Sequence, residues 1–230
     1  ANVTVPPAPG GLIVIRASGA GAQPVEASFT LTPVVSLSPA TGSPGFPLTV
    51  RGDGFRANQS GISISFGVAI VASAAANSQG SWTTTFTIPP SPKGTYSVKG
   101  SGADLEALFT VTPAVSLSGN RGNPGTSLTV TGSGFAARET GIAVTLGETP
   151  VASGISADVE GSWSAAFPVP SLPAGPYTLL ASGSLTSAGG VRRETFTIGA
   201  QLTVSPSNGS PGMEVNITGR GFGANEQDIA

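Results

Sequence analysis

The stretch from residue 42 to residue 55 reads Gly42-Ser43-Pro44-Gly45-Phe46-Pro47-Leu48-Thr49-Val50-Arg51-Gly52-Asp53-Gly54-Phe55, and two related versions follow it. Its opening turn returns at residues 122–125 and 209–212. Its closing Gly-x-Gly-Phe returns at residues 132–135 and 219–222. The copies begin 80 residues apart, from 42 to 122, and then 87 residues apart, from 122 to 209. A long, nearly fixed period indicates tandem copies of one structural unit.

Short runs of alternating polar and apolar residues surround this motif. Val35-Ser36-Leu37-Ser38 precedes it and Leu48-Thr49-Val50 lies inside it. Apolar side chains at every second position are typical of a strand that buries one face. The glycines that close the motif indicate a bulge or a positive φ, with Phe55 turned back into the core.

The rest of each copy shows the same alternation, separated by turn residues. A run of about seven short strands within one such copy predicts an immunoglobulin-like sandwich. No long segment has the 3.6-residue periodicity of a helix, so we expect an all-β protein with tandem immunoglobulin-like β-sandwich repeats and almost no helix. The further strands are predicted around residues 62–66, 82–88, 96–98 and 109–111, and around residues 142–146, 163–169, 177–179 and 196–198.

The repeats divide the chain into four segments. Residues 33–112 and 113–199 are predicted to be complete repeats. Residues 1–32 match the last strands of a repeat, and residues 200–230 match the first strands of another. Neither end segment can bury a core alone. Two explanations fit: the chain is an excerpt of a longer array, or the tail of one subunit and the head of the next complete a shared domain.

Composition excludes several kinds of function. Charged residues make up only 10% of the chain, the net charge is −2, and there is no Cys and no His. Thiol catalysis, a Ser-His-Asp triad and thiolate or imidazole metal sites are therefore ruled out. A nucleic-acid partner would need a basic face, and a membrane span would need a long apolar run that the sequence lacks. We expect no enzyme, no catalytic residue, no cofactor and no metal site.

The segment Ser38-Pro39-Ala40-Thr41-Gly42-Ser43-Pro44-Gly45, followed by Leu48-Thr49-Val50-Arg51-Gly52-Asp53-Gly54-Phe55, resembles the IPT/TIG family of immunoglobulin-like domains. Asp158-x-x-Gly161-x-Trp163 is similar to tandem immunoglobulin-like repeats of large bacterial surface proteins. This resemblance implies the sandwich fold and an extracellular or cell-surface location in a prokaryote. It implies no catalytic residue. Related domains serve as spacers, adhesin stalks, surface-layer building blocks and accessory modules of secreted glycosidases.

The motif residues are predicted to be structural. Trp82 and Trp163 recur at equivalent positions beside a turn, so core packing is a better interpretation than a sugar-stacking platform. Tyr96 and Tyr177 are interpreted as corner tyrosines that bond the backbone rather than ligand-binding groups. The structural set is Gly52, Gly54, Phe55, Gly132, Gly134, Phe135, Gly219, Gly221, Phe222, Trp82 and Trp163.

Two local features remain as candidates for binding. Asp158 and Glu160 offer hard oxygens to Ca²⁺, but the earlier repeat has Asn77 and Gln79 there, and two carboxylates are too few for a calcium site. Residues 182–193 form the main insertion of the second complete repeat, and they end in Arg192-Arg193. Insertions in repeat arrays often lie on a contact face, so Arg192 and Arg193 are the predicted partner contact.

Three functions compete. The leading hypothesis is a structural extracellular protein whose repeats form part of a stalk, sheath, filament or surface layer. The second is the spacer of a cell-surface adhesin, and the third is a non-catalytic module of a secreted polysaccharide-degrading enzyme. The expected partners are other copies of the chain, neighbouring surface proteins and glycans, because a weakly charged surface rich in small residues favours packing against neighbours.

Overall fold

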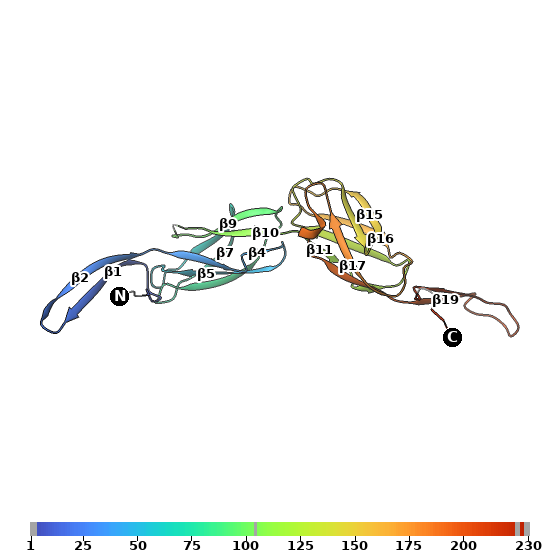
Figure 1. Cartoon of the computed structure of the whole chain (residues 1–230), viewed down its shortest axis with the longest axis horizontal. Coiled ribbons are helices and arrows are strands. Elements are labelled where there is room, and N and C mark those ends of the chain that lie inside the picture. Colours follow the sequence, from blue (N-terminus) through green and yellow to red (C-terminus); the bar gives the residue numbers. More distant parts are fainter. Residues whose placement is uncertain (1–3, 104, 224–225, 228–230) are drawn as a thin grey trace. The chain divides into compact units, whose positions relative to one another are not determined.

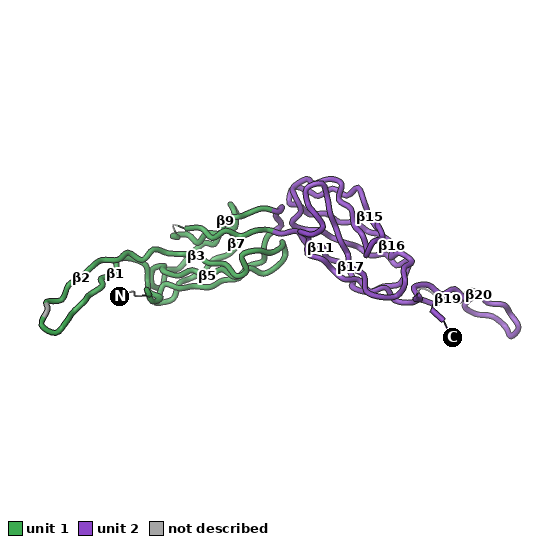
Figure 2. The backbone as a smooth tube through the Cα atoms, viewed as in Figure 1, with its two compact units in different colours: residues 1–89, 94–111 green, residues 90–93, 112–230 purple. Residues whose placement is uncertain are grey.

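The computed structural model describes residues 4–103, 105–223 and 226–227. Residues 1–3 and 228–230 of the two predicted end segments lie outside the described residues, as do residues 104 and 224–225. The chain divides into two compact units (Figure 2), one of residues 1–89 with 94–111 and one of residues 90–93 with 112–230. The described elements are strands and one 3-10 turn at Ala188–Gly190 (Figure 1), which confirms the predicted all-β fold.

The first complete repeat is a sandwich of two sheets. Its small sheet runs in the order β3 (Val34–Ser38), β5 (Pro47–Asp53), β8 (Trp82–Thr87). Its large sheet runs in the order β4 (Thr41–Gly42), β10 (Ala107–Val111), β9 (Gly94–Gly100), β6 (Ile62–Phe66), β7 (Ala69–Ala74). All neighbours are antiparallel except β4 and β10. β4 and β7 are the strands that the sequence did not predict, because β4 has only two residues and β7 does not alternate polar and apolar residues.

The second complete repeat has the same topology. Its small sheet is β11 (Ala114–Leu117), β13 (Ser127–Ser133), β16 (Trp163–Pro168). Its large sheet is β12 (Arg121–Gly122), β18 (Glu194–Ile198), β17 (Gly175–Ser182), β14 (Ile142–Leu146), β15 (Thr149–Ile155). The 3-10 turn lies between β17 and β18, inside the insertion.

Each end segment forms a hairpin. In the first unit, β1 (Gly11–Gly19) pairs with β2 (Ala22–Leu31), and in the second, β19 (Gln201–Ser205) pairs with β20 (Asn216–Arg220). Ile13 lies opposite Phe29 in the first hairpin, as Tyr96 lies opposite Phe109 between β9 and β10. The β1–β2 hairpin thus has the register of the last two strands of a repeat.

Each complete repeat has its own core, filled by the inward side chains of both sheets. In β6, Ile62, Ile64 and Phe66 are buried while the two serines between them are half-buried. Burying a side chain of this size contributes about 1.5–3 kcal/mol. Phe55, Phe109, Phe135 and Phe196 are the largest fully buried side chains. The predicted alternation therefore separates core from surface correctly along these strands.

Candidate functional site

The first glycine of each Gly-x-Gly-Phe motif makes room for a tryptophan. Gly52 is the cross-strand partner of Trp82, and a Cβ atom at Gly52 would lie 2.2 Å from Trp82 Cε2. Gly132 and Trp163 repeat the pair, with a corresponding separation of 2.1 Å. Any side chain at either glycine would displace the indole ring.

The second glycine turns the chain so that the phenylalanine enters the core. Gly54 has a φ of 75° and Gly134 a φ of 69°, in the left-handed region that favours glycine. Phe55 and Phe135 are fully buried. The Phe55 ring meets Trp82 edge-on, with centroids 5.4 Å apart. In the third copy, Gly221 has a φ of 72°.

Both tryptophans lie inside the sandwiches. Trp82 is 4% exposed and Trp163 is 6% exposed, so neither offers a ring face to a sugar. Their Nε1 atoms are buried without a hydrogen-bond partner in the structure. The indoles thus act as apolar volume, a detail that the sequence does not reveal.

The turn before each tryptophan uses its Asn or Asp to bond the backbone. Asp158 Oδ1 accepts the backbone N–H groups of Glu160 at 2.8 Å and Ser162 at 2.9 Å. Asn77 Oδ1 accepts the equivalent pair at 2.9 and 3.0 Å. Asp158 therefore accepts the same two backbone hydrogen bonds that the neutral amide of Asn77 accepts in the first repeat. Within the described ranges, no three His, Cys, Asp or Glu residues come together as metal ligands do.

Tyr177 confirms the predicted corner tyrosine. Its hydroxyl donates a hydrogen bond to the backbone oxygen of Pro173 at 2.9 Å. Tyr96 stacks on Phe66, with ring centroids 4.8 Å apart. Both tyrosines are half-buried structural residues.

A contact that we call the linker clamp ties a proline-rich segment to the Gly-x-Gly-Phe phenylalanine. In the first unit, the Gly10 N–H donates to the Phe55 oxygen at 2.8 Å, and the Phe55 N–H donates to the Gly80 oxygen at 2.9 Å. A Cβ atom at Gly80 would lie 2.0 Å from the Phe55 oxygen and 3.0 Å from Pro9 Cα. Only glycine fits between the segment and the motif.

The second unit contains the same linker clamp. The Lys93 N–H donates to the Phe135 oxygen at 2.9 Å, and the Phe135 N–H donates to the Gly161 oxygen at 3.0 Å. A Cβ atom at Gly161 would lie 2.1 Å from the Phe135 oxygen and 3.0 Å from Pro92 Cα. This contact was not predicted from the sequence. Its signal was the recurrence of Pro-x-Pro at residues 7–9 and 90–92.

The insertion of the second repeat is held by a buried carboxylate that the sequence analysis also missed. Glu139 is 1% exposed. Its Oε1 accepts the N–H groups of Leu185 at 2.7 Å and Thr186 at 2.6 Å. Its Oε2 accepts the Thr186 hydroxyl at 2.7 Å and the Ala136 N–H at 2.9 Å. Four donors on two oxygens leave this carboxylate well satisfied.

These contacts set the protonation of Glu139. Burial by itself raises the pKa of the carboxyl group, because the charged form loses water. The hydrogen bonds from Thr186, Ala136 and Leu185 favour the charged form and outweigh that effect, so the pKa of Glu139 lies below its usual value. The ionised carboxylate is therefore the state that organises the insertion.

The two arginines predicted as a partner contact lie at the end of the insertion. The Arg192 N–H donates to the Pro113 oxygen at 2.9 Å, and its oxygen accepts the Val115 N–H at 3.3 Å. Both arginine side chains are exposed. At the other end of the insertion, the Lys93 ammonium donates to the Leu185 oxygen. The backbone of this loop is thus fixed to the domain, while the side chains of Arg192 and Arg193 are exposed.

Two mainly antiparallel sheets packed around one core, repeated in tandem, define the class as immunoglobulin-like repeat proteins. The sequence model described as "IPT/TIG domain" matches residues 33–113 and 110–198. The chain belongs to the IPT/TIG domain family. This confirms the resemblance drawn from the motif residues.

Comparison with solved structures gives only weak likenesses. One is SGBP-B of the mixed-linkage glucan utilization locus of Bacteroides ovatus, in complex with a heptasaccharide. It is 16% identical to this chain with a TM-score of 0.35, and the alignment covers 84% of this chain and 53% of that structure's chain. The Yersinia pseudotuberculosis adhesin InvE is 16% identical with a TM-score of 0.31, and the alignment covers 72% of this chain and 58% of the InvE chain. Invasin, a bacterial integrin-binding protein, is 16% identical with a TM-score of 0.29, and the alignment covers 85% of this chain and 47% of the invasin chain.

The chain thus spans about half the length of these structures. No curated protein sequence matches it significantly. None of the described residues belongs to a helix with the length and hydropathy needed to span a bilayer.

Proposed function

We propose that this chain is a structural protein of a prokaryotic cell surface, in which tandem IPT/TIG modules form part of a stalk, sheath, filament or surface layer. The observation that carries the proposal is the linker clamp. In both units a backbone N–H of the proline-containing segment donates to the oxygen of the motif phenylalanine, at 2.8 Å from Gly10 to Phe55 and 2.9 Å from Lys93 to Phe135. A backbone bond that recurs between a proline-containing segment and the motif of each unit suits an array built from copies of one module.

The clamp uses backbone groups rather than charges. Backbone N–H and carbonyl groups buried in such a contact must be paired, and the pairing is insensitive to the salt and pH outside a cell. Each segment contains Pro-x-Pro, which limits the conformations open to the unfolded chain. A spacer benefits from such a fixed contact.

The exposed pair Arg192 and Arg193 is the proposed contact with a neighbouring surface protein or another copy of the chain. Both side chains extend from a loop whose backbone is fixed by Glu139 and by the bonds to Pro113 and Val115. A fixed loop loses little conformational entropy when a partner binds. Guanidinium groups favour carboxylates, so the partner surface would be acidic.

Surface shaving tests the location. Intact cells of the producing organism are treated with trypsin, and the released peptides are identified by mass spectrometry. Peptides from residues 33–199 should appear without cell lysis. Their appearance only after lysis would exclude a surface role.

The clamp is tested with Gly161→Ala, which places a Cβ atom 2.1 Å from the Phe135 oxygen. We expect faster tryptic cleavage after Lys93, because its N–H loses its acceptor when the clamp opens. Cleavage after Arg16, in the hairpin of the other unit, is the internal control and should not change. An unchanged cleavage rate after Lys93 would show that the clamp does not restrain this segment.

A further inference from the structure

The outermost strand of the large sheet in the first repeat, β7, has an open edge. It pairs with β6 on one side, and none of the described strands pairs with its other side. An edge strand presents backbone N–H and C=O groups that can pair with another chain. Proteins usually block such edges with charged side chains, prolines or bulges. The two complete repeats differ in these features.

In the second repeat the equivalent strand, β15, has a blocked edge. Glu148 lies in the turn before it and Pro150 lies within it. The pairing of β14 with β15 also shifts register at two places, whereas the pairing of β6 with β7 shifts at one. A charge, a proline and an additional irregularity all oppose the approach of a further strand.

In the first repeat the matching positions are apolar. Val68 stands where Glu148 stands in the second repeat, and Ile70 stands where Pro150 stands. Val68 is fully exposed and Ile70 is 73% exposed, and no large apolar side chain in the described part of the chain is more exposed than these two. The sequence of β7, Ala-Ile-Val-Ala-Ser-Ala, contains no charge and no proline. The edge of β7 is therefore both open and apolar.

Pro150 also indicates which way the backbone of Ile70 faces. Ile70 lies opposite Ser65 in β6, and Pro150 lies opposite Thr145 in β14, so the two positions have the same register. A proline has no N–H, and in an edge strand it stands where that group would point away from the neighbouring strand. The N–H of Ile70 therefore points toward the open edge, where it can donate to another strand.

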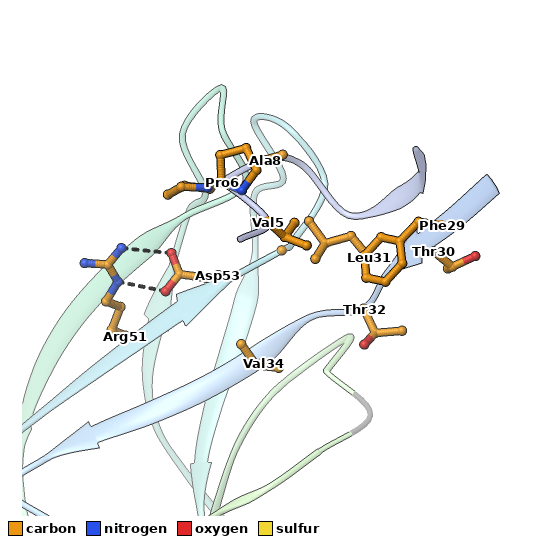
Figure 3. Close-up of a pocket in the computed structure, with 12 residues that line it drawn as sticks. Val5, Pro6, Ala8, Phe29, Thr30, Leu31, Thr32, Val34, Arg51 and Asp53 are labelled. Carbon is orange, nitrogen blue, oxygen red and sulfur yellow. Dashed lines mark hydrogen bonds and ion pairs between the residues drawn. The ribbon is translucent and has the colours of Figure 1, made fainter. Parts of the chain in front are cut away.

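Other exposed surfaces of the first repeat carry charged groups. On β5 the side chains of Arg51 and Asp53 form a two-point ion pair (Figure 3), with contacts of 2.8 and 3.0 Å. On β9, Lys99 Nζ lies 3.0 Å from Glu106 Oε2. Covering such charges with a partner removes their water, which costs free energy. Covering β7 removes water from apolar side chains instead, which is favourable.

We propose that β7 pairs antiparallel with β7 of a second copy of this chain, with Ile70 at the centre of the pairing. Each Ile70 then lies opposite Ile70 of the other copy, and each Val68 lies opposite Ala72 of the other copy. The proposal goes beyond the structural role given above and does not depend on it, because the pairing is a property of the purified chain wherever it is located.

A second copy fits this edge because the strand is complementary to itself. Two strands related by a two-fold axis bring each residue opposite a residue of the same sequence, so a charged strand would meet its own charge. The sequence of β7 has no charge to repel. In a hydrogen-bonded antiparallel pair, opposed residues exchange both N–H···O bonds, so each Ile70 N–H would donate to the Ile70 oxygen of the other copy.

Sedimentation equilibrium of the whole chain, up to millimolar concentration, tests the pairing. An edge of six residues makes a small interface, so we expect a weak dimer that forms as concentration rises. Ile70→Pro and Val68→Glu copy residues that the second repeat already carries, so both variants should keep their unfolding transition. Each should weaken dimerisation about tenfold or more. Leu108→Glu, at an exposed apolar residue of β10, is the control and should dimerise as wild type does.

Cross-linking locates the contact, because the native chain has no Cys. A short bis-maleimide reagent should join two copies of the Ile70→Cys variant. Ser153→Cys, at an exposed position of β15 that leaves its proline in place, should give far less cross-linked dimer.

Three results would each overturn the proposal. One is a wild-type chain that stays monomeric up to millimolar concentration. The second is a dimer that is equally stable in wild type and in folded Ile70→Pro, which would place the contact elsewhere, for example on the end hairpins. The third is equal cross-linking of the Ile70→Cys and Ser153→Cys variants. Surface shaving can fail while the dimer forms, so the two proposals are tested separately.

Discussion

Gly52 and Trp82 face each other across β5 and β8, and a Cβ atom on Gly52 would lie 2.2 Å from Trp82 Cε2. The second repeat places Gly132 and Trp163 in the same relationship at 2.1 Å. A missing side chain on one strand and the largest side chain on its neighbour thus fill one space together. This pairing explains why the glycine and the tryptophan recur in both complete repeats.

Adding a methyl group at Gly132 should destabilise the second unit. Gly132→Ala forces the Trp163 ring out of position, and overpacking of this kind costs about 1–3 kcal/mol. Gly119→Ala is the matched control, since the nearest atom to its Cβ would be 4.0 Å away. Denaturant unfolding followed by Trp163 fluorescence measures both. Equal stability of the two variants would contradict the packing argument.

Removing a tryptophan should cost more than replacing it with phenylalanine. Trp163→Ala leaves a large cavity and should cost about 3–5 kcal/mol. Trp163→Phe should cost clearly less, because the Nε1 group that is lost has no hydrogen-bond partner. Trp82 remains in either variant and reports on the first unit as an internal control. If the two variants were equally unstable, the indole N–H would have to make a bond that the structure lacks.

Acid should loosen the insertion. The folded pKa of Glu139 is lowered, so its contribution to stability is fully present above the usual value of 4.5 and is lost as pH falls through the folded pKa. At pH 7, Glu139→Gln should destabilise the second unit by about 1–3 kcal/mol, because an amide has only one acceptor oxygen for these donors.

The difference between wild type and Glu139→Gln should shrink as pH is lowered below 4.5. Hydrogen exchange at the Leu185 and Thr186 amides gives a local readout, and Gln59 at the matching position of the first repeat supplies a natural amide for comparison. A difference that stays constant down to acid pH would show that the carboxylate charge is irrelevant.

Asp158 should behave as a turn residue and not as a calcium ligand. Asp158→Asn keeps the oxygen that accepts the Glu160 and Ser162 N–H groups, as Asn77 does in the first repeat. We expect its thermal midpoint to match wild type, whereas Asp158→Ala should cost about 1 kcal/mol. Added Ca²⁺ should shift neither protein. A calcium-dependent rise in the wild-type midpoint that Asp158→Asn abolishes would contradict this role.

Much of the fold follows from the sequence alone, because its causes are local. Alternation in β6 places Ile64 inward and the neighbouring serines outward whatever surrounds the strand. The left-handed φ of Gly54 follows from a glycine before a buried phenylalanine. Because the sequence repeats, the same strand and turn predictions apply to the equivalent residues of the second copy. Two strands in each repeat were not predicted. β4 and β12 have two residues and therefore no period, and β7 and β15 do not alternate polar and apolar residues.

The candidate sites depend on contacts between residues far apart in the chain, and only the tertiary structure decides these. Nothing in the sequence connects Glu139 with Thr186, because the bond exists only where the insertion folds back over that position. The linker clamp likewise needs the Gly10 N–H to meet the Phe55 oxygen. Periodicity reveals which side of a strand is buried, whereas the approach of two distant segments depends on how the whole chain packs.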